Sequence, residues 1–459
     1  MKFLLAQINP VVGDLEGNAN KILSIASKAN SLSADFVLTP ELSLWGYPAN
    51  DLLLKKNLIR NQYQILDQLA LDINKKYRDL SITVGMAEII NDSFFPNLYN
   101  SIALLEGGEW KIIARKIILP TYEVFDEKRY FRSEKKVSVL IKKIKNKTWR
   151  LGFTICEDLW VNKDIEGRGI HKKNPIIDFK KKKVDILVNL SASPYTFKKL
   201  ELRSKVSSFA AQYLQVPLIY VNQIGANDNL IFDGNSFILD KNGSKIKQLK
   251  SFSEELSSWE IEQTKPEKNK FENSEISSIF DALVLGVKDY AKKCGFKTAL
   301  IGLSGGIDSA LVSAIATAAL GSDNVYCISM PSKWSSSHSK IDAKDLARRL
   351  KINFNTIPIE NLMTSFEESF LKTIDFEMAE LTNQNIQSRI RGTLLMALAN
   401  QDNHLLLSTG NKSELAVGYC TLYGDMNGGL SVIGDLYKSN VFKLCNWLDS
   451  EDSIKHRKS

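Results

Sequence analysis

Residues 298–309 read TALIGLSGGIDS, an apolar run followed by a turn rich in serine and glycine. The apolar part predicts a buried strand that ends at Leu303, and the turn then leads into a helix. Glycines let backbone N–H groups approach a phosphate, and a helix N-terminus adds a favourable partial positive charge. The stretch therefore predicts a phosphate-binding turn in an α/β fold. It is not a Walker A motif, because it lacks the Gly-Lys-Ser/Thr ending.

The segments around this turn continue the α/β pattern. Ahead of it, apolar residues recur every three or four positions from Ile276 to Tyr290, which predicts an amphipathic helix. Beyond the turn, the pattern predicts strands at 325–330 and 405–408 and helices at 340–350 and 386–399. Alternating strands and helices of this kind predict a doubly wound parallel sheet.

A second α/β region precedes this one. Short apolar and β-branched runs, such as 35–38, 81–85 and 185–188, recur there between polar segments. The chain then becomes polar and charged and is interrupted by Pro266, as linkers are. The sequence therefore predicts three parts, which are a first domain over 1–262, a linker over 263–275 and a second domain over 276–459.

The composition of the 459-residue chain limits its class. It is 44% hydrophobic and 24% charged, and no apolar run approaches the roughly 20 residues that span a bilayer. The five cysteines are scattered and form no CxxC pair, which argues against a disulfide framework or a zinc site. The net charge of +8 is modest, and lysine runs such as 180–183 favour solvated loops over nucleic-acid binding. We therefore expect a cytoplasmic protein with small-molecule substrates, without a nucleic-acid or membrane partner.

Three segments of the first domain end predicted strands with reactive side chains. Cys156 follows an apolar run, Glu41 closes a Thr-Pro-Glu segment, and Lys116 precedes a chain-turning proline. A thiol is activated by a nearby base or cation, a carboxylate can act as that base, and an ammonium group can stabilise an oxyanion. Taken singly, each residue is more typical of an inert buried thiol or a surface charge, so the prediction of a nucleophilic site depends on the combination.

Glu41, Lys116 and Cys156, in this order and each at a strand end, resemble the catalytic triad of the nitrilase superfamily. The run from Leu119 to Phe131, with Tyr122 and Glu127, resembles the glutaminase branch of that superfamily. The resemblance implies a nitrilase-like αββα sandwich. It also implies that Glu41 takes the thiol proton, Cys156 attacks the glutamine amide and Lys116 stabilises the oxyanion, while Glu127 holds Lys116 and the substrate. The residues implied to bind glutamine are Tyr122, Ser191 and Ser193, and the two serines are equally consistent with ordinary loop residues.

The turn at 304–309 resembles the PP-loop of N-type ATP pyrophosphatases, and the segments 387–393, 408–415 and 418–429 resemble those of the glutamine-dependent NAD⁺ synthetase family. The resemblance implies an adenine nucleotide α-hydrolase-like second domain, ATP and Mg²⁺ as cofactors, and a homo-oligomer. The implied reaction is the ATP-dependent amidation of deamido-NAD⁺ to NAD⁺ with ammonia from glutamine, releasing AMP, pyrophosphate and glutamate.

The resemblance also implies roles for individual residues of the second domain. The implied ATP-binding residues are Ser304, Gly305, Gly306, Asp308, Ser309 and Thr409. The implied metal ligands are Asp308 and Glu414, and the residues implied to bind deamido-NAD⁺ are Arg389, Asp425 and Lys438. Without this context, Arg389 and Arg391 would be interpreted as the solvated face of a helix.

The resemblance stops before the end of the family's pattern. Residues 449–459 are polar and without periodicity, which predicts a disordered tail or a premature end. A missing closing loop predicts reduced or absent ligase activity, because water would reach the adenylate. Two alternatives therefore stay open at this point: a stand-alone glutaminase or amidase with an inactive synthetase half, and a non-catalytic subunit that assembles with complete ones.

Overall fold

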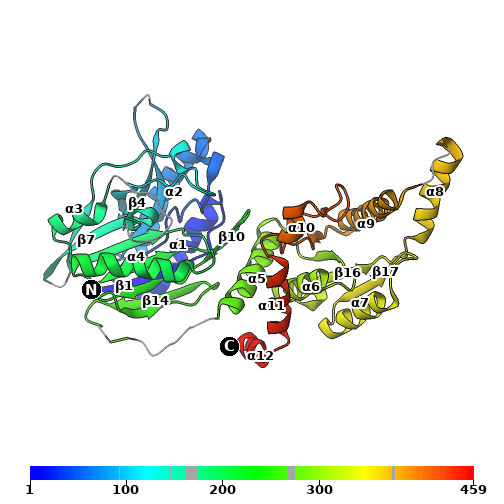
Figure 1. Cartoon of the computed structure of the whole chain (residues 1–459). Helices are drawn as coiled ribbons and strands as arrows, with labels where there is room; N and C mark the ends of the chain where they lie inside the picture. The colour runs from blue at the N-terminus through cyan, green and yellow to red at the C-terminus, as the bar shows by residue number, and fades with distance from the viewer. Residues whose placement is uncertain are drawn as a thin grey trace. The chain divides into compact units, whose positions relative to one another are not determined.

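The computed structural model describes residues 1–459 except Ser93, Lys145, 162–172, Thr264, 267–273, 375–377 and Ser459, and except the side chains of 373, 374 and 458. The chain divides into two compact units, Met1–Glu272 and Asn273–Ser459 (Figure 1). Residues 267–273 of the predicted linker lie outside the described residues, so the exact domain limits stay a prediction.

The described part of the first unit contains two six-stranded sheets, in the order β14-β1-β2-β3-β4-β5 and β13-β12-β9-β8-β7-β6. The strands of the first sheet are β1 (Lys2–Gln7), β2 (Phe36–Leu38), β3 (Ser81–Ile89), β4 (Leu98–Glu106), β5 (Glu109–Arg115) and β14 (Glu255–Glu260). Those of the second are β6 (Val139–Ile144), β7 (Lys147–Ile155), β8 (Ile186–Ser191), β9 (Leu218–Asn222), β12 (Phe237–Leu239) and β13 (Lys245–Gln248). A separate pair is formed by β10 (Ile224–Asn227) and β11 (Leu230–Asp233).

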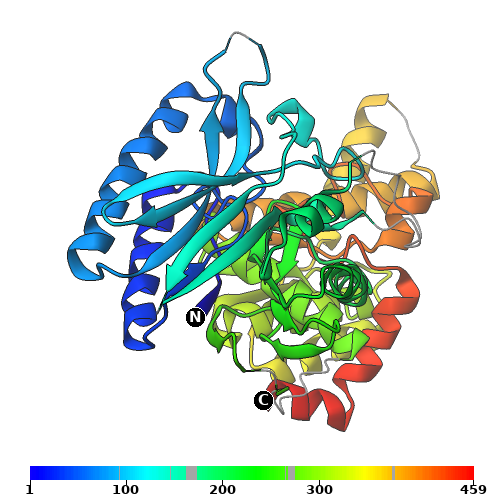
Figure 2. The same ribbon diagram turned by 90° about the vertical axis from the view of Figure 1, so that its left-hand side faces the viewer.

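Helices cover the outer faces of the two sheets of the first unit. The helices are α1 (Leu15–Ser31), α2 (Lys56–Lys76), α3 (Pro175–Lys182) and α4 (Lys199–Leu214), with 3₁₀ helices η1 (Asn50–Leu54), η2 (Glu127–Arg129) and η3 (Cys156–Leu159). Along β1, Leu4 and Ala6 pack with α1 and α2 on one face, while Phe3 and Leu5 join the core between the sheets. In Figure 2 the two blue helices lie along one side of the unit. Since α3 and α4 pack on the other sheet, the predicted αββα sandwich is confirmed.

The second unit is built on one parallel sheet with the order β17-β16-β15-β18-β19. Its strands are β15 (Ala299–Gly302), β16 (Val325–Ser329), β17 (Asn353–Thr356), β18 (Leu405–Ser408) and β19 (Leu430–Ser431). Its helices are α5 (Glu275–Lys293), α6 (Ile307–Leu320), α7 (Ser337–Leu350), α8 (Glu360–Ile374), α9 (Glu380–Asp402), α10 (Lys412–Val417), α11 (Lys438–Leu448) and α12 (Glu451–Lys458), with the 3₁₀ helix η4 (Ser322–Asn324).

Helices of the second unit pack on both faces of this sheet. One apolar core joins Ile301 to α5, α6, α7 and α11, and another joins Leu300 and Leu406 to α8 and α9. The predicted doubly wound fold is confirmed. The strand order reverses between β15 and β18, and in such sheets ligands bind beyond the carboxyl ends of the strands at this switch point. The turn at 304–309 directly follows β15, so the fold places it there.

The prediction of a disordered tail after Asp449 is wrong, because α12 (Glu451–Lys458) follows α11. The helix is stabilised at its start, where the Ser453 N–H donates to Ser450 Oγ at 3.3 Å and acidic residues occupy the first turn. Its far end contacts α5 of the same unit, with His456 Nε2 3.0 Å from both carboxylate oxygens of Asp281. The His456 ring also packs edge-on against Trp447 of α11. A short polar helix can thus form without apolar periodicity when a cap and contacts with neighbouring helices stabilise it.

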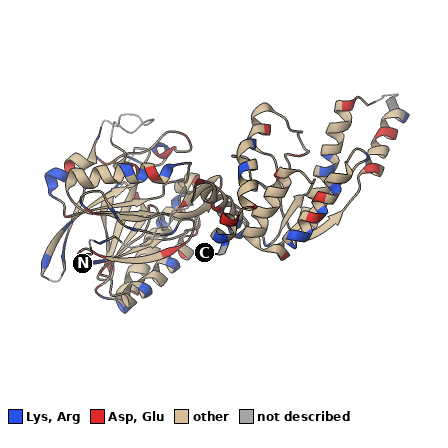
Figure 3. Ribbon diagram, turned by 60° about the horizontal axis from the view of Figure 1, so that its bottom comes forward, with Lys and Arg blue, Asp and Glu red and all other residues tan. Residues whose placement is uncertain are grey.

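Among the described residues, none of the helices combines the length and hydropathy that crossing a bilayer requires. Basic and acidic residues are interspersed on both units rather than separated by sign (Figure 3).

Candidate active sites

The two sheets of the first unit bring the predicted amidase residues together. Glu41 lies just beyond β2 and Lys116 directly beyond β5, and both strands belong to the first sheet. Cys156 directly follows β7 of the second sheet and begins η3. The apolar residues between the sheets pack face to face, so these strand ends meet at one edge of the sandwich.

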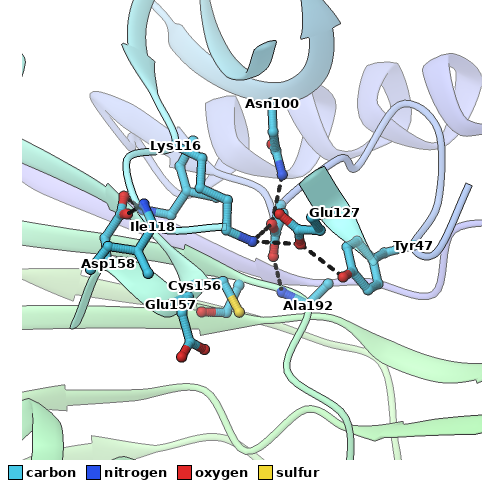
Figure 4. A network of polar contacts seen from close by, with 12 residues as sticks. Tyr47, Asn100, Lys116, Ile118, Glu127, Cys156, Glu157, Asp158 and Ala192 are labelled. Atoms are coloured by element: carbon cyan, nitrogen blue, oxygen red, sulfur yellow. Dashed lines mark hydrogen bonds and ion pairs between the residues drawn. The ribbon is translucent and has the colours of Figure 1, made fainter. Parts of the chain in front are cut away.

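The centre of this site is the buried ammonium group of Lys116 (Figure 4). Its Nζ lies 2.6 Å from Glu41 Oε1 and 2.7 Å from Glu127 Oε1. Burial alone would lower the pKa of Lys116, but the carboxylates of Glu127 and Glu41 hold the pKa well above its ordinary value. Lys116 is therefore a cation held between two acids. The resemblance implied this contact for Glu127 but not for Glu41, which was expected only to take the thiol proton.

Neighbouring groups fix the orientation of both carboxylates. Asn100 Nδ2 donates to Glu41 Oε1 at 2.7 Å, and the Ala192 backbone N–H donates to Glu41 Oε2 at 3.0 Å. Tyr47 Oη donates to Glu127 Oε1 at 2.8 Å, whereas Glu127 Oε2 is buried and has no hydrogen-bond partner among the described residues. Because buried polar atoms are normally paired, that oxygen can accept from a ligand.

Sequence reasoning missed Asn100 and Tyr47. Asn100 lies in β4, a largely apolar strand in which an amide is unusual. This contrast could have indicated a functional or hydrogen-bonding role for Asn100. Nothing in the sequence around Tyr47 distinguishes it from a core tyrosine.

The turn that carries Glu41 needs a close approach to β3. Leu42 has a φ of 45°, in the left-handed region that strains a branched side chain. A Cβ on Gly85 would lie 2.2 Å from the Leu42 nitrogen and 2.8 Å from the Pro40 oxygen. Gly85 is therefore the residue that allows this turn to lie against the sheet.

Cys156 is buried and also strained, with a φ of 47°. Burial and the charge of Glu41 raise the pKa of its thiol well above the ordinary value, while Lys116 opposes them. The resting residue is therefore a thiol, and its attack requires a base that removes the proton during the reaction. Glu41 interacts electrostatically with Cys156 and is suited to this task.

The predicted glutamine-binding residues surround the same strand ends. Tyr122 Oη donates to Glu157 Oε2 at 2.9 Å, beside the nucleophile. Ser191 ends β8, which pairs with β7, and its hydroxyl donates to the Asn189 side chain. Ser193 is buried, and its Oγ accepts from Arg203 Nε at 3.1 Å. The structure thus brings all three near Cys156, and their role in binding stays a prediction.

In the second unit, a cavity of about 380 Å³ lies at the switch point between β15 and β18. Ser304, Thr409 and Asp425 are among its lining residues. The Gly306 N–H donates to Ser304 Oγ at 3.1 Å, and the Ser304 N–H donates to Ser309 Oγ at 3.3 Å, so the turn is braced by its own hydroxyls.

Gly305 is required in this turn. Its φ is 86°, and a Cβ there would lie 2.3 Å from the Ser339 carbonyl oxygen.

The two predicted metal ligands are connected through Asn411. Asp308 Oδ1 accepts from Asn411 Nδ2 at 3.2 Å, while Glu414 Oε2 accepts from the Asn411 backbone N–H at 3.0 Å. Asp308 also forms an ion pair with Lys438. In the described part of the chain no three acidic, histidine or cysteine side chains form a metal site by themselves. Mg²⁺ is usually held by one or two carboxylates with phosphate oxygens and water, so Asp308 and Glu414 fit it.

The two arginines of α9 differ. Arg389 is exposed, donates from Nε to the Leu422 carbonyl at 3.2 Å and does not line the cavity. Arg391 lines the cavity and donates from Nε to the Met330 carbonyl at 3.0 Å. Burial lowers the pKa of Arg391, and no carboxylate in the described residues pairs with it. Residues two positions apart lie on different faces of a helix. The helical spacing of the two arginines could therefore have predicted that they have different surroundings.

Comparison with known proteins relates each part of the chain to a known family. Residues 5–266 match the carbon-nitrogen hydrolase family, and residues 279–458 match the NAD synthase family. The glutamine-dependent NAD(+) synthetase of Synechocystis sp. is 46% identical over 455 residues, which are 98% of this chain and 81% of that protein. The corresponding synthetase of Acinetobacter baylyi is 39% identical over 97% of this chain and 79% of that protein.

A solved structure of a synthetase also aligns with this chain through both units. The glutamine-dependent NAD+ synthetase from Acinetobacter baumannii, in complex with adenosine diphosphate, has a TM-score of 0.89 and 37% identity, over 98% of this chain and 82% of that chain. Two family matches that together cover almost the whole sequence, and relatives that align through both units, lead to one conclusion: the chain belongs to the glutamine-dependent NAD(+) synthetase family.

Proposed function

We propose that this chain is a glutamine-hydrolysing NAD⁺ synthase. It amidates deamido-NAD⁺ to NAD⁺ with ammonia from glutamine, and it consumes ATP to give AMP and pyrophosphate. The observation that carries this proposal is the buried cluster of Lys116, Glu41 and Glu127 beside Cys156, in a chain that also carries the 304–309 turn at the switch point of a doubly wound sheet.

The first reaction cleaves the glutamine amide. The Cys156 sulfur attacks the amide carbon while Glu41 takes the thiol proton, and the Lys116 ammonium stabilises the negative charge that develops on the oxygen. Collapse of the tetrahedral intermediate returns a proton to the nitrogen and releases ammonia, leaving a thioester. Water then hydrolyses the thioester to glutamate. Tyr122, Ser191 and Ser193 bind the substrate, and Glu127 holds Lys116 and accepts a substrate hydrogen bond on its free oxygen.

The second reaction activates the nicotinate carboxylate. A carboxylate oxygen attacks the α-phosphorus of ATP and pyrophosphate leaves, with the N–H groups of the 304–309 turn binding the phosphates. Ammonia then attacks the acyl carbon, and AMP leaves with its oxygen. Thr409 contacts the ATP, while Arg389, Asp425 and Lys438 bind deamido-NAD⁺. Asp308 and Glu414 would hold Mg²⁺, which neutralises phosphate charge when bound.

The partly buried cation Arg391 is a further phosphate-binding residue in this proposal. A guanidinium group that lines a nucleotide cavity without a carboxylate partner favours an anionic ligand, and arginine matches phosphate geometry well.

The Cys156→Ala variant tests the two-reaction proposal. NAD⁺ formation is measured with glutamine and, separately, with an ammonium salt as nitrogen donor. We expect the glutamine-driven rate to be lost and the ammonium-driven rate to be retained, because the thiol acts only in ammonia release. The matched control is Cys294→Ala, which removes an exposed thiol. Equal loss with both donors would contradict the proposal.

The alternative of a lone amidase is not favoured, because the relatives align through both units and are named glutamine-dependent NAD(+) synthetases. Measuring ammonia release from glutamine beside NAD⁺ formation separates the two, since a lone amidase releases ammonia without any dependence on ATP and forms no NAD⁺. A non-catalytic subunit would show neither activity.

We also infer a homo-oligomer and a cytoplasmic location. Several large apolar side chains of the second unit, such as Tyr419, Leu422 and Tyr423, are largely exposed, and exposed apolar patches are typical of interfaces. All five cysteines are free thiols, which fits a reducing compartment. Sedimentation analysis of the full chain tests the oligomer, and a single monomeric species would contradict it.

A further inference from the structure

The carboxylate of Asp158 joins the two strand ends that carry the amidase residues. Its Oδ1 accepts the backbone N–H groups of Ile117 at 3.0 Å and Ile118 at 2.8 Å, and its Oδ2 accepts that of Ile155 at 3.0 Å (Figure 4). The side chain is buried, with 1% of the residue exposed. Ile117 follows Lys116 in the chain and Ile155 precedes Cys156. One carboxylate therefore links the backbone next to the cation to the backbone next to the nucleophile.

This link crosses from one sheet to the other. Lys116 follows β5 of the first sheet, whereas Cys156 and Asp158 follow β7 of the second. Apolar packing between the sheets is non-directional, so it does not by itself fix how the two strand ends are aligned. Three hydrogen bonds to one buried carboxylate are directional, and they restrict the shift of one segment against the other.

The same carboxylate supports the strained nucleophile. Cys156 has a φ of 47°, and a non-glycine residue in this region persists only when its surroundings hold it there. The bond from the Ile155 N–H to Asp158 Oδ2 spans Cys156 and closes its turn. Loss of that bond would let the turn relax and would move the sulfur.

Stability alone does not account for this carboxylate. Burial raises the pKa of Asp158 to about 6, while the three backbone N–H groups and Lys116 oppose that effect. In the described residues no cation forms an ion pair with Asp158. An ionised carboxylate without a paired cation costs free energy when it is buried, so an acceptor at this position is better explained by the geometry it imposes.

We propose that Asp158 is a positioning residue for the amidase reaction, which aligns the Lys116 ammonium group with the Cys156 sulfur across the two sheets. The inference rests on the proposed glutamine hydrolysis. All three of its bonds require an acceptor. In Asp158→Asn, Oδ1 can still accept from Ile117 and Ile118, but the amide nitrogen donates and cannot accept from Ile155. The variant thus breaks the link on the Cys156 side while preserving size.

The test compares Asp158→Asn with Asp185→Asn in the full chain. Asp185 Oδ2 likewise accepts a backbone N–H, that of Arg150 at 2.7 Å, but Asp185 lies before β8 and away from the site. We measure kcat and KM for glutamine, the ammonium-driven rate, and the unfolding of the first unit by tryptophan fluorescence. In Asp158→Asn we expect kcat with glutamine to fall about 100-fold, because a misplacement of roughly 1 Å has this effect, with KM changed less than about threefold. Asp185→Asn keeps both parameters within about threefold.

A purely structural role predicts a different result. If Asp158→Asn keeps the wild-type kcat, or if only KM rises, the proposal is overturned. It is also overturned if kcat falls only in proportion to the fraction of the first unit that is unfolded.

If Asp158→Asn does not fold, Asp158→Glu is measured instead. The longer side chain keeps a carboxylate acceptor for the Ile155 N–H but moves that acceptor from its present position. A folded Asp158→Glu with reduced kcat and unchanged KM supports the proposal, and one with wild-type kcat overturns it. Failure of the proposed function itself would look different, because the wild-type chain would then release no glutamate from glutamine.

Discussion

The two candidate sites of this chain hold their charges in opposite ways. In the amidase site, the Lys116, Glu41 and Glu127 side chains are almost completely buried, and both carboxylates pair with Lys116. In the nucleotide site, the Lys438 and Asp308 side chains are 39% and 17% exposed, and Arg391 has no acidic partner in the described residues. The first site satisfies its charges before a substrate arrives, whereas the second leaves positive charge for an anionic ligand. Removing a cation should therefore have different consequences in the two units.

The largest difference is expected between Lys116→Met and Lys438→Met. Lys116→Met leaves two buried carboxylates without their cation, so we expect the free energy of unfolding of the first unit to fall by about 3–5 kcal/mol. Glutamine-driven synthesis is then lost. Lys438→Met breaks a partly exposed pair and lowers the free energy of unfolding by less than about 1 kcal/mol. Urea unfolding, followed separately for each unit, measures both.

The rates of NAD⁺ synthesis with each nitrogen donor extend this comparison. Lys116→Met should retain the ammonium-driven rate, while Lys438→Met should lose synthesis with either nitrogen donor. Similar losses of stability in both variants would show that the two sites do not differ in the way their burial indicates.

Gly85→Ala tests whether the amidase site depends on a close backbone approach. The new Cβ would lie 2.2 Å from the Leu42 nitrogen, so the turn carrying Glu41 must move away from β3. We expect the first unit to lose about 1–3 kcal/mol of stability, as overpacked sites do. Glutamine-driven synthesis should fall more strongly than that loss explains, because Glu41 is displaced.

Ammonium-driven synthesis is the internal control for Gly85→Ala, since it depends on the second unit. In that unit, Gly305→Ala should reduce the rate with both donors, because its Cβ would meet the Ser339 carbonyl oxygen at 2.3 Å. A Gly85→Ala variant with normal glutamine hydrolysis would show that the Glu41 turn tolerates displacement.

Arg391→Met should weaken ATP binding without weakening the fold. A charge-assisted hydrogen bond contributes about 1.5–3 kcal/mol, so the KM for ATP should rise about 10- to 100-fold in the ammonium-driven assay. The stability of the second unit should stay equal or increase, because the variant removes a partly buried cation that has no acidic partner in the described residues. The effect on stability is thus opposite to that of Lys116→Met, which should lower the free energy of unfolding of the first unit.

Arg389→Met is the matched variant for Arg391→Met. It should raise the KM for deamido-NAD⁺ and leave the KM for ATP unchanged, because Arg389 lies outside the cavity. If Arg389→Met and Arg391→Met change the same constant, the assignment of separate ligands to the two arginines is wrong.

The sequence predicted those features that depend on local pattern. The strand, turn and helix at 298–309 were predicted because apolar runs and glycines determine them locally. The order of Glu41, Lys116 and Cys156 at strand ends indicated the αββα sandwich through resemblance, and the structure confirms the fold. Their meeting at one edge follows from the face-to-face packing of the two sheets.

Contacts between residues far apart in the chain could not be predicted from the sequence. Asn100 and Asp158 contact residues 59 and 40 positions away along the chain, and only the pairing of the sheets brings them there. The α12 helix was missed because a cap and contacts with α5 and α11 stabilise it, rather than an apolar stripe. In α9, composition suggested a solvated face for both arginines, whereas one of them lines the cavity.

The smallest expected effect concerns the reactivity of the nucleophile itself. Iodoacetamide reacts with thiolates, so a raised pKa leaves less reactive sulfur at a given pH. Burial and the charge of Glu41 raise the pKa of Cys156, so Cys156 should be alkylated more slowly at pH 8 than the exposed Cys294, as followed by peptide mass spectrometry.

Because burial also limits the access of the reagent, the decisive comparison is between variants at the same cysteine. Glu41→Gln removes a negative neighbour and leaves the Lys116 cation, so the pKa of Cys156 should fall and its alkylation should accelerate, by about tenfold for each pKa unit. Glutamine hydrolysis should disappear in the same variant, because the base is gone. Lys116→Met should slow alkylation for the opposite reason. Faster labelling together with lost hydrolysis would separate the two roles of Glu41, which raises the thiol pKa at rest and removes the proton during attack. Unchanged labelling in both variants would show that these charges do not control the sulfur.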